Sequence, residues 1–171
     1  MKKALINYIQ NPKFDELYTP KYAIEPLIKY LPKTRVTIWE CTDYGESNIT
    51  KVLREHGYNV ITTHKNNFNF LTDTPNFYFD IIVTNPPYSL KDEFLKKCYD
   101  YGKPFALLLP ITALEGITRG RMFRERGVEL LVFDKRCDFL DNKKSNWFNT
   151  SWFCYKVLPK QLIFEELKKT N

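Results

Sequence analysis

Apolar residues in this chain gather in short runs that alternate with helix-like patterns. The runs are rich in β-branched and aromatic residues and are bounded by turn residues, so they predict buried strands. They span residues 35–40, 58–63, 79–84, 105–110, 128–133 and 150–157. Helical patterns, one of them basic, fall before, between and after these runs. They span residues 20–31, 47–56, 90–101, 119–126 and 159–169. This alternation predicts an α/β domain with a doubly wound sheet.

The composition fits one globular domain of 171 residues, because no linker, repeat or low-complexity stretch divides the chain. Residues 1–17 form a predicted lead-in, and residues 158–171 contain the predicted terminal helix. The hydrophobic fraction of 43%, with 13 Phe, 11 Tyr and 3 Trp, suffices for a real core. The 26 basic and 20 acidic residues leave a formal charge of +6. Because the charges are dispersed, this excess is compatible with a polyanionic partner and equally with solubility alone.

The chain has four widely spaced cysteines without a Cys-x-x-Cys pair, and only two histidines, His56 and His64. The cysteines are Cys41, Cys98, Cys137 and Cys154. This set predicts neither a metal site nor a disulfide framework, so we expect reduced, mostly buried thiols in a cytoplasmic protein. The N-terminal residues are too briefly apolar for a signal peptide, and no run has transmembrane length. No association with a membrane is therefore expected.

A polar loop follows the strand predicted at residues 79–84. It consists of Asn85, Pro86, Pro87 and Tyr88, at the carboxyl end of a strand, where open α/β sheets bind ligands. The prolines fix φ at about −65° and lack an N–H, so the loop is rigid and its carbonyls point outward as acceptors. Asn85 adds an acceptor and two donors, and Tyr88 adds a flat ring for stacking. Such a loop can hold the exocyclic amine of a planar ligand; the alternative is an ordinary proline turn.

Residues 80–88, Asp-Ile-Ile-Val-Thr-Asn-Pro-Pro-Tyr, resemble the catalytic motif of the S-adenosylmethionine-dependent methyltransferases that act on the N6 amine of adenine. The resemblance implies that the Asn85 side chain and the Pro86 carbonyl accept hydrogen bonds from the target amine, while Tyr88 stacks on the flipped base. It also implies direct attack of the amine on the sulfonium methyl group, without a covalent enzyme intermediate. A base must leave the stack for such chemistry, which accounts for the aromatic platform.

The resemblance further implies a Rossmann-like methyltransferase sheet of about seven strands. The strands predicted at residues 128–133 and 150–157 would form its antiparallel end hairpin. On the cofactor side, Tyr18, Thr19 and Pro20 would help to cover the methionine end of S-adenosylmethionine. Without the resemblance, these residues are simply the start of a helix that Thr19 caps.

The segment from Glu40 to Ser47 lies where this family carries its glycine-rich cofactor loop. The resemblance implies cofactor contacts from Glu40, Cys41, Thr42 and Gly45. Glycines allow the backbone to approach the ligand closely. Gly45 is the one that remains of the usual Gly-x-Gly, because Ser47 replaces the second glycine.

Two later positions of the cofactor side differ from the family's usual residues. At the end of the second predicted strand the family has an acidic residue that bridges the ribose hydroxyls, and this chain has His64. A neutral histidine accepts one hydrogen bond and a charged one accepts none, so we expect weaker cofactor binding. The usual Asp-Phe pair beside the adenine ring appears as Asn69 and Phe70. Asn69 can still accept from an adenine amine, and Phe70 can supply the ring contact.

A basic loop interleaved with aromatic residues follows the strand at residues 128–133. Its candidate substrate contacts are Lys135, Arg136, Phe139 and Trp147. Such a loop suits an unpaired or flipped base, and a packed aromatic cover is the alternative. Residues 135–139 and 151–153 also resemble the same late positions of small phage- and bacterium-type adenine methyltransferases. The arginines of residues 119–126 would contact nucleic-acid phosphates or form a solvated face.

The leading prediction is an S-adenosylmethionine-dependent N6-adenine methyltransferase acting on nucleic acid, with DNA favoured over RNA. DNA-modifying relatives carry a separate target-recognition domain, for which we expect no room in these 171 residues. We therefore expect modest specificity, a single-stranded substrate, or recognition lent by a protein partner or a homo-oligomer. The alternative is a catalytically impaired methyltransferase fold that binds nucleic acid or a host protein as an inhibitor or regulator. Its support is that Ser47, His64 and Asn69 alter the cofactor side while residues 85–88 are intact.

Overall fold

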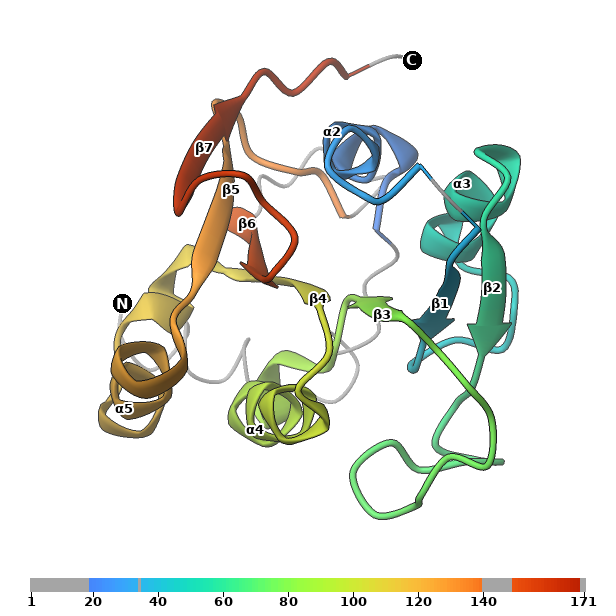
Figure 1. The fold of residues 1–171 in the computed structure, drawn as a ribbon. Helices are drawn as coiled ribbons and strands as arrows, with labels where there is room; N and C mark the ends of the chain where they lie inside the picture. Colours follow the sequence, from blue (N-terminus) through green and yellow to red (C-terminus); the bar gives the residue numbers. More distant parts are fainter. Residues whose placement is uncertain (1–18, 34, 140–148, 170–171) are drawn as a thin grey trace.

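The computed structural model describes residues 19–33, 35–139 and 149–169. These residues form a seven-stranded sheet in the order β2-β1-β3-β4-β6-β5-β7 (Figure 1). The strands are β1 (Thr37–Glu40), β2 (Asn59–Thr62), β3 (Ile81–Thr84), β4 (Phe105–Pro110), β5 (Glu129–Phe133), β6 (Thr150–Tyr155) and β7 (Leu162–Glu165). The α-helices are α2 (Glu25–Ile28), α3 (Asn48–Glu55), α4 (Lys91–Tyr101) and α5 (Ile117–Arg126). Short 3-10 helices are η2 (Lys21–Ala23), η3 (Tyr88–Leu90) and η4 (Ile111–Leu114).

The strand directions are those of a doubly wound sheet. Strands β2, β1, β3 and β4 are parallel, and β6 runs antiparallel to both β4 and β5. The chain passes from β1 outward to β2 and then returns to the other side of β1 to form β3. The strand order therefore reverses between β1 and β3, whose carboxyl ends mark the switch point at which such sheets bind ligands. The predicted fold class and the antiparallel pairing of β5 with β6 are confirmed.

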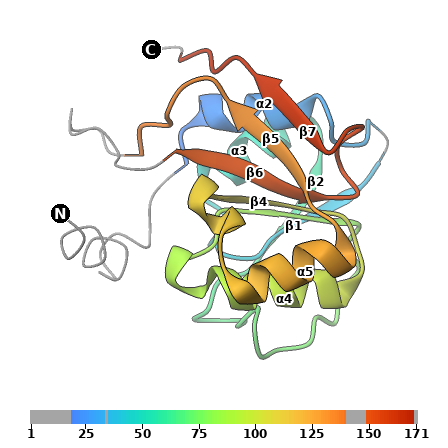
Figure 2. The same cartoon turned by 90° about the vertical axis from the view of Figure 1, so that its left-hand side faces the viewer.

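Helices cover both faces of the sheet (Figure 2). On one face, η2, α2 and α3 bury a first core that includes Ile24, Ile38 and Leu53. On the other face, α4 and α5 cover a second core that includes Trp39 and Phe94. Ile38 and Trp39 enter different cores because successive side chains of a strand point to opposite faces. All residues of β4 are buried, as expected for a central strand that is covered on both sides.

The predicted terminal helix at residues 159–169 is wrong, because this segment contains strand β7. Ile163 is β-branched and Phe164 is aromatic, which favours a strand, and the segment pairs in parallel on the open side of β5. That pairing satisfies backbone groups that a helix would otherwise have satisfied internally. The helix predicted at residues 20–31 is divided into η2 and α2.

The cysteines agree with the prediction, since all four are buried free thiols. In the described ranges, no helix is long and apolar enough to cross a membrane. The same residues contain no group of three or more His, Cys, Asp or Glu side chains that could hold a metal ion.

Candidate active site

The candidate site lies where β1 and β3 end side by side. β3 is a run of four buried residues, and it stops because Pro86 and Pro87 have no N–H to donate to a neighbouring strand. Pro87 has φ −54° and ψ 123°, and the chain then turns into η3 at Tyr88. The predicted catalytic residues thus form a rigid loop at the switch point, as their sequence indicates.

A buried hydrogen-bond network joins the ends of these two strands. Oε1 of Glu40 accepts bonds from the backbone N–H and the hydroxyl of Thr42, each at 3.0 Å, and from the hydroxyl of Thr84. The two threonine hydroxyls are 2.8 Å apart, and Thr42 Oγ1 lies 3.5 Å from the carbonyl oxygen of Asn85. Glu40 therefore connects the loop after β1 to the loop after β3.

Burial governs the charge of this carboxyl group. Glu40 is 1% exposed. Burial raises the pKa of Glu40 to about 7, against the opposing effect of the hydrogen bonds from Thr84 and Thr42. The group therefore changes its protonation near neutral pH, and Thr42 lies between it and the candidate catalytic loop.

The loop after β1 is organised by Asp43, which the sequence interpretation did not single out. Its carboxylate accepts from the N–H of Glu46 at 3.2 Å, from that of Ser47 at 3.1 Å, and from the hydroxyl of Thr50 at 2.6 Å. Burial alone would raise the pKa of Asp43, but the hydrogen bonds from Thr50 and Ser47 outweigh it and hold this pKa below its ordinary value. The spacing of an acid four residues before a serine that opens a helix was the available signal.

Two residues of this loop explain its altered glycine pattern. Gly45 has φ +108°, a backbone conformation that L side chains rarely adopt. Ser47 has φ −64° and ψ 154°, which any residue can adopt, and its Oγ accepts from the N–H of Thr50 as the N-cap of α3. The replacement of the second glycine by Ser47 therefore strains nothing and adds a helix cap.

Thr19 connects the segment before η2 to the catalytic loop. Nδ2 of Asn85 donates to Thr19 Oγ1 at 3.1 Å, and Nδ2 of Asn48 donates to the Thr19 carbonyl at 2.9 Å. Thr19 is 4% exposed. The prediction that Thr19 caps a helix is wrong, because Pro20 occupies the N-cap of η2. Asn48, at the first position of α3, was not identified from the sequence. Tyr18, the first residue of the predicted aromatic-Thr-Pro segment, lies outside the described residues.

The aromatic residue of the loop is mostly buried. Tyr88 is 7% exposed and belongs to the second core, while Pro86 is buried and Pro87 is half-buried. The carbonyl of Tyr88 accepts from Nζ of Lys91 at 3.1 Å, which ties the loop to the start of α4. The ring of Tyr88 thus lies inward in this structure, and its role as a stacking platform stays a prediction.

At the end of β2, His64 forms an aromatic pair with Tyr44 of the loop after β1. Their ring centroids are 3.8 Å apart with the planes inclined by 30°. Nδ2 of Asn66 donates to the Tyr44 hydroxyl, and Oδ1 of Asn67 accepts from the His64 N–H at 3.0 Å. Tyr44 is 59% exposed. The position predicted for the ribose contact is therefore part of a tilted aromatic pair that sequence reasoning missed, although an aromatic residue within the cofactor loop was a visible signal.

Asn69 lies in a turn, whereas Phe70 lies in the second core. Oδ1 of Asn69 accepts from the N–H of Leu71 at 3.0 Å, a local turn contact. Phe70 is 2% exposed and stacks on Phe94, with centroids 4.9 Å apart and planes inclined by 15°. A contact of either residue with the cofactor stays a prediction. Cys41 is buried at the end of β1, among the second core.

Among the candidate substrate residues after β5, Lys135 and Arg136 are exposed, whereas Phe139 packs against the first core. Nε of Arg136 donates to Oδ1 of Asn149 at 2.8 Å, and Nζ of Lys135 lies 3.8 Å from Oδ2 of Asp134. Phe139 is 7% exposed and belongs to the first core, which corresponds to the packed alternative for this loop. Trp147 lies outside the described residues. The neighbouring Asp138 N–H donates to the hydroxyl of Tyr22 at 2.8 Å, which brings this segment beside η2.

No protein-family model and no curated protein sequence matches the chain. A solved structure from Listeria monocytogenes, described as a class I S-adenosylmethionine-dependent methyltransferase, superposes with a TM-score of 0.56 at 11% identity, covering 97% of this chain and 72% of that one. The chain has a methyltransferase fold. A protein from Vibrio vulnificus YJ016, described as the modification subunit of a type I restriction enzyme, has a TM-score of 0.51 at 11% identity. The match covers 99% of this chain and 50% of that one, so the chain spans half the length of the Vibrio protein.

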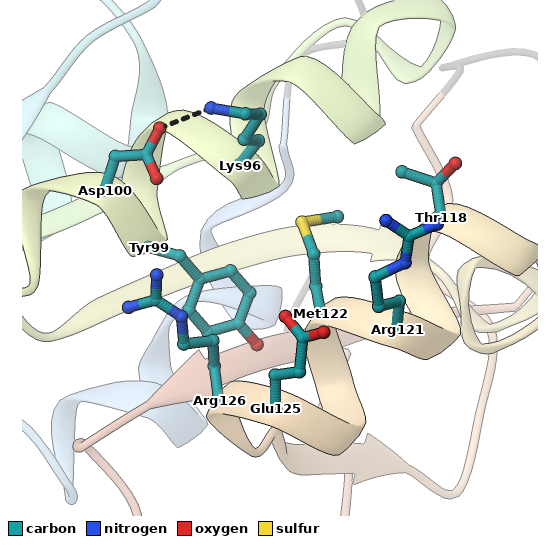
Figure 3. A pocket seen from close by; sticks show the side chains of 8 residues that line it. All are labelled: Lys96, Tyr99, Asp100, Thr118, Arg121, Met122, Glu125 and Arg126. Carbon is teal, nitrogen blue, oxygen red and sulfur yellow. Dashed lines mark hydrogen bonds and ion pairs between the residues drawn. The ribbon is translucent and has the colours of Figure 1, made fainter.

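Away from the switch point, the methyltransferase fold has a surface pocket between α4 and α5 (Figure 3). Its volume is about 280 Å³, and neither the loop after β1 nor the loop after β3 contributes to its lining. Arg121 and Arg126 of α5 line it together with Lys96 of α4, which forms an ion pair with Asp100 at 2.7 Å. Its cationic and acidic side chains are mixed, so the pocket differs in chemistry from the polar, strand-end site.

Proposed function

We propose that this chain is an S-adenosylmethionine-dependent methyltransferase that modifies the N6 amine of adenine in nucleic acid, DNA rather than RNA. The observation that most supports the proposal is the setting of Asn85. Its amide is bonded to Thr19 at 3.1 Å, at the carboxyl end of β3 and beside the Glu40 network of β1. An oriented amide at a switch point suits the recognition of a small planar amine.

Each residue of the loop has a role in this proposal. Asn85 Oδ1 and the Pro86 carbonyl accept hydrogen bonds from the two N–H groups of the adenine amine, which orients the nitrogen lone pair. The fixed φ of the two prolines holds these acceptors in place with little entropy left to lose. Tyr88 supplies a ring on which the base stacks. Because Tyr88 is 7% exposed in this structure, its ring has to turn outward when the base binds. S-adenosylmethionine, when bound, supplies a methyl group on a sulfonium sulfur, which is electrophilic enough to react with an amine directly.

The residues fit the cofactor well on one side and less well on the other. Near β1, the turn at Gly45 (φ +108°) and the start of α3 at Asn48 would let the backbone approach the cofactor. Thr19 and Asn85 would face the methionine end. On the ribose side, His64 stands where a carboxylate would bind two hydroxyls, and its ring forms a tilted pair with Tyr44. We therefore expect cofactor binding that is weak rather than absent.

Nucleic acid is favoured as the substrate by charge and by the loop chemistry. The formal charge is +6, and α5 presents Arg121, Arg124 and Arg126 on its exposed surface. The similarity in fold to a protein described as the modification subunit of a type I restriction enzyme agrees with DNA as the substrate. We further propose that a protein partner or a second copy takes part in the recognition of a target sequence.

A second candidate function rests on the Tyr44–His64 pair. If this stack closes the ribose position, the chain is a methyltransferase fold that binds nucleic acid or a host protein as an inhibitor or regulator. The Asn69 turn and the buried Phe70 agree with this alternative, because both residues are engaged within the protein. The two candidates differ in whether the chain binds S-adenosylmethionine.

The deciding experiment combines calorimetry with S-adenosylmethionine and a tritiated-methyl transfer assay. The substrates are unmethylated duplex DNA, single-stranded DNA and RNA of the same sequence. We expect weak cofactor binding and label in adenine of DNA. Absence of binding at millimolar cofactor would end the enzyme proposal for this chain, and nucleic-acid binding without label transfer would favour the alternative.

Tyr88→Ala separates chemistry from cofactor binding. We expect loss of methyl transfer with cofactor affinity retained, because the ring acts on the base. Tyr78→Ala is the matched control, since Tyr78 is 69% exposed and lies before β3 rather than after it. Equal loss of transfer and of cofactor binding in Tyr88→Ala would make Tyr88 a structural residue.

A further inference from the structure

Thr19 is the residue through which helix α3 reaches the loop after β3. Nδ2 of Asn48 donates to the Thr19 carbonyl at 2.9 Å, and Nδ2 of Asn85 donates to Thr19 Oγ1 at 3.1 Å. Asn48 lies 29 positions after Thr19 in the chain, and Asn85 lies 66 positions after it. We call these two hydrogen bonds the Thr19 link. The link joins three separate segments, which are the one before η2, the start of α3 and the loop after β3.

Both supports of the Thr19 link are anchored to the same core. Asn48 is the first residue of α3, and the next residue, Ile49, is buried in the first core together with Ala23 of η2. The carbonyl of Ala23 accepts from Nε1 of Trp152 at 2.9 Å, a buried bond that ties η2 to β6. Thr19 is 4% exposed, so packing restricts the side-chain rotation that would exchange its hydroxyl and methyl groups. The Thr19 hydroxyl is therefore held in one direction.

The orientation of the Asn85 amide decides which ligand group it can bind. A planar side-chain amide carries two donors on its nitrogen and an acceptor oxygen on its other side. With the nitrogen of Asn85 on Thr19, the oxygen takes the opposite side of the amide, where it can accept from an amine. The reversed amide would present N–H donors and would suit a carbonyl or a ring nitrogen instead. Thr19 thus sets the chemical preference of this position.

We propose that Asn48 is a positioning residue for methyl transfer, which acts through Thr19 to hold the oxygen of Asn85 toward the target amine. This role rests on the function proposed above for the loop after β3. The bond from Asn48 restrains the Thr19 carbonyl, and the restrained backbone keeps the Thr19 hydroxyl within bonding distance of the Asn85 nitrogen. The link favours bases that carry an exocyclic amine over bases that present a carbonyl at the same place.

The alternative role for Asn48 is to help open helix α3. Ser47 already caps this helix, since its Oγ accepts from the Thr50 N–H at 3.2 Å. Aspartate suits the first turn of a helix at least as well as asparagine, because a negative charge is favoured at the N-terminus. Asn48→Asp therefore keeps the helix start but replaces the donor to Thr19 with a carboxylate that repels the Thr19 carbonyl. The two roles of Asn48 predict opposite results for this variant.

Methyl transfer by Asn48→Asp tests the positioning role. We expect the rate at saturating cofactor and DNA to fall roughly tenfold, because the Asn85 amide loses its fixed orientation. Cofactor affinity, measured by calorimetry, and thermal stability should be retained. Asn59→Asp is the matched control, because Asn59 is an exposed amide of β2 that also donates to a threonine hydroxyl, that of Thr37 at 3.0 Å. It should keep the transfer rate.

Three results with Asn48→Asp would overturn the positioning role. An unchanged transfer rate would leave Asn48 as a helix residue alone. An equal loss in Asn59→Asp would mean that the added charge, and not the lost donor, slows transfer. A fall in cofactor affinity that matches the fall in rate would assign Asn48 to cofactor binding.

The Thr19 link can also be tested without methyl transfer, by nuclear magnetic resonance of the Asn85 side-chain NH2 group. Its resonance is assigned by its absence in Asn85→Asp. We expect slow exchange of these protons with water in the parent and in Thr19→Ser, which keeps the hydroxyl. Exchange should be several-fold faster in Thr19→Val, which lacks the acceptor, and in Asn48→Asp.

The exchange rates separate failure of the link from failure of the proposed function. Exchange that Asn48→Asp leaves unchanged would overturn the link, whether or not the chain transfers methyl groups. A parent that transfers no methyl group would overturn the proposed function, and the exchange rates would still decide whether Asn48 orients Asn85 through Thr19.

Discussion

The loops that follow β1 and β3 end side by side, but they are held in different ways. The loop after β1 is closed on itself, because the Asp43 carboxylate binds the N–H of Ser47 and the hydroxyl of Thr50 a few residues later. The loop after β3 is held from outside, because Asn85 donates to Thr19, 66 residues earlier in the chain. The first loop can form locally, whereas the second takes its final geometry when the sheet and the segment at Thr19 have come together.

This difference matches the work that each loop is proposed to do. A loop whose polar groups are satisfied internally offers a stable backbone shape to a ligand but few side-chain groups. A loop that is held by distant residues presents a side chain in a fixed orientation, which is what recognition of a reacting amine needs. Glu40 belongs to both, since it binds Thr42 in one loop and Thr84 beside the other.

Asn85→Ala should give the largest effect. It removes the amide that is proposed to orient the amine, and we expect methyl transfer to fall by about 10²–10³-fold, as for other groups that stabilise a developing charge. The tritiated-methyl assay measures the rate, and calorimetry measures the cofactor affinity. Asn59→Ala, at an exposed position of β2, is the control and should keep the transfer rate. Transfer within a few-fold of the parent would show that the loop after β3 is not the catalytic one.

Glu40→Gln tests the residue that joins the two loops. Burial raises the pKa of Glu40 from an ordinary 4.5 to about 7, so between these values the native state keeps a proton that the unfolded chain releases. The stabilisation from this group is complete below pH 4.5 and is lost as the pH rises through about 7. Two to three pKa units correspond to a loss on the order of 3 kcal/mol.

Glutamine should remove that loss, because an amide oxygen can still accept from Thr42 and Thr84 and carries no charge to desolvate. Urea unfolding of Glu40→Gln should therefore show a flatter pH dependence than the parent between about pH 4.5 and about pH 7. Glu93→Gln, at an exposed position of α4, should leave the parent slope unchanged. An unchanged slope in Glu40→Gln would place the pH dependence on another group.

The sequence predicted well what depends on neighbouring residues. β3 and β4 are continuous buried runs, and the loop after β3 is set by two prolines, so both are visible in a short window. The Glu40–Thr84 contact joins residues 44 positions apart, and no local pattern indicates it. The aromatic contact of Tyr44 with His64 likewise depends on the pairing of β1 with β2, which a single loop sequence does not contain.

The segment after residue 158 shows that a local pattern can also predict the wrong element. Leu162, Ile163 and Leu167 fit one face of a helix, so the helical prediction followed from their spacing. The strand forms instead because β5 has an open side. Pairing there gives backbone groups of β7 their hydrogen-bond partners, and it buries Leu167 and part of Ile163 in the first core. Tertiary context thus overrides a periodicity that is ambiguous over so few residues.

Asp43→Ala should destabilise the loop after β1 without touching the loop after β3. It leaves the N–H of Ser47, that of Glu46 and the Thr50 hydroxyl without their acceptor, and we expect a loss of about 2 kcal/mol in the free energy of unfolding. Asp43→Asn should lose less at neutral pH, because the amide oxygen still accepts.

Asp73→Ala is the external control, since Asp73 is exposed and accepts from the Asn69 N–H in another turn. Urea unfolding at neutral pH compares the three variants. A similar loss for Asp43→Ala and Asp73→Ala would mean that the loop after β1 does not depend on its internal acceptor.

His64→Asp should have the smallest effect and bears on the cofactor side alone. A carboxylate accepts from two ribose hydroxyls where neutral histidine accepts one bond, so we expect cofactor affinity to rise by up to about tenfold, or about 1.4 kcal/mol. His64→Asn is the matched control, because it removes the stack on Tyr44 without adding a carboxylate. A gain in both variants would mean that the aromatic pair obstructs the ribose, and a gain in His64→Asp alone that the missing charge limits binding. If calorimetry shows no gain in either variant, the ribose does not bind at the end of β2. The loop after β1 would then have to bind the cofactor through Thr42 and Gly45, without a contact from the end of β2.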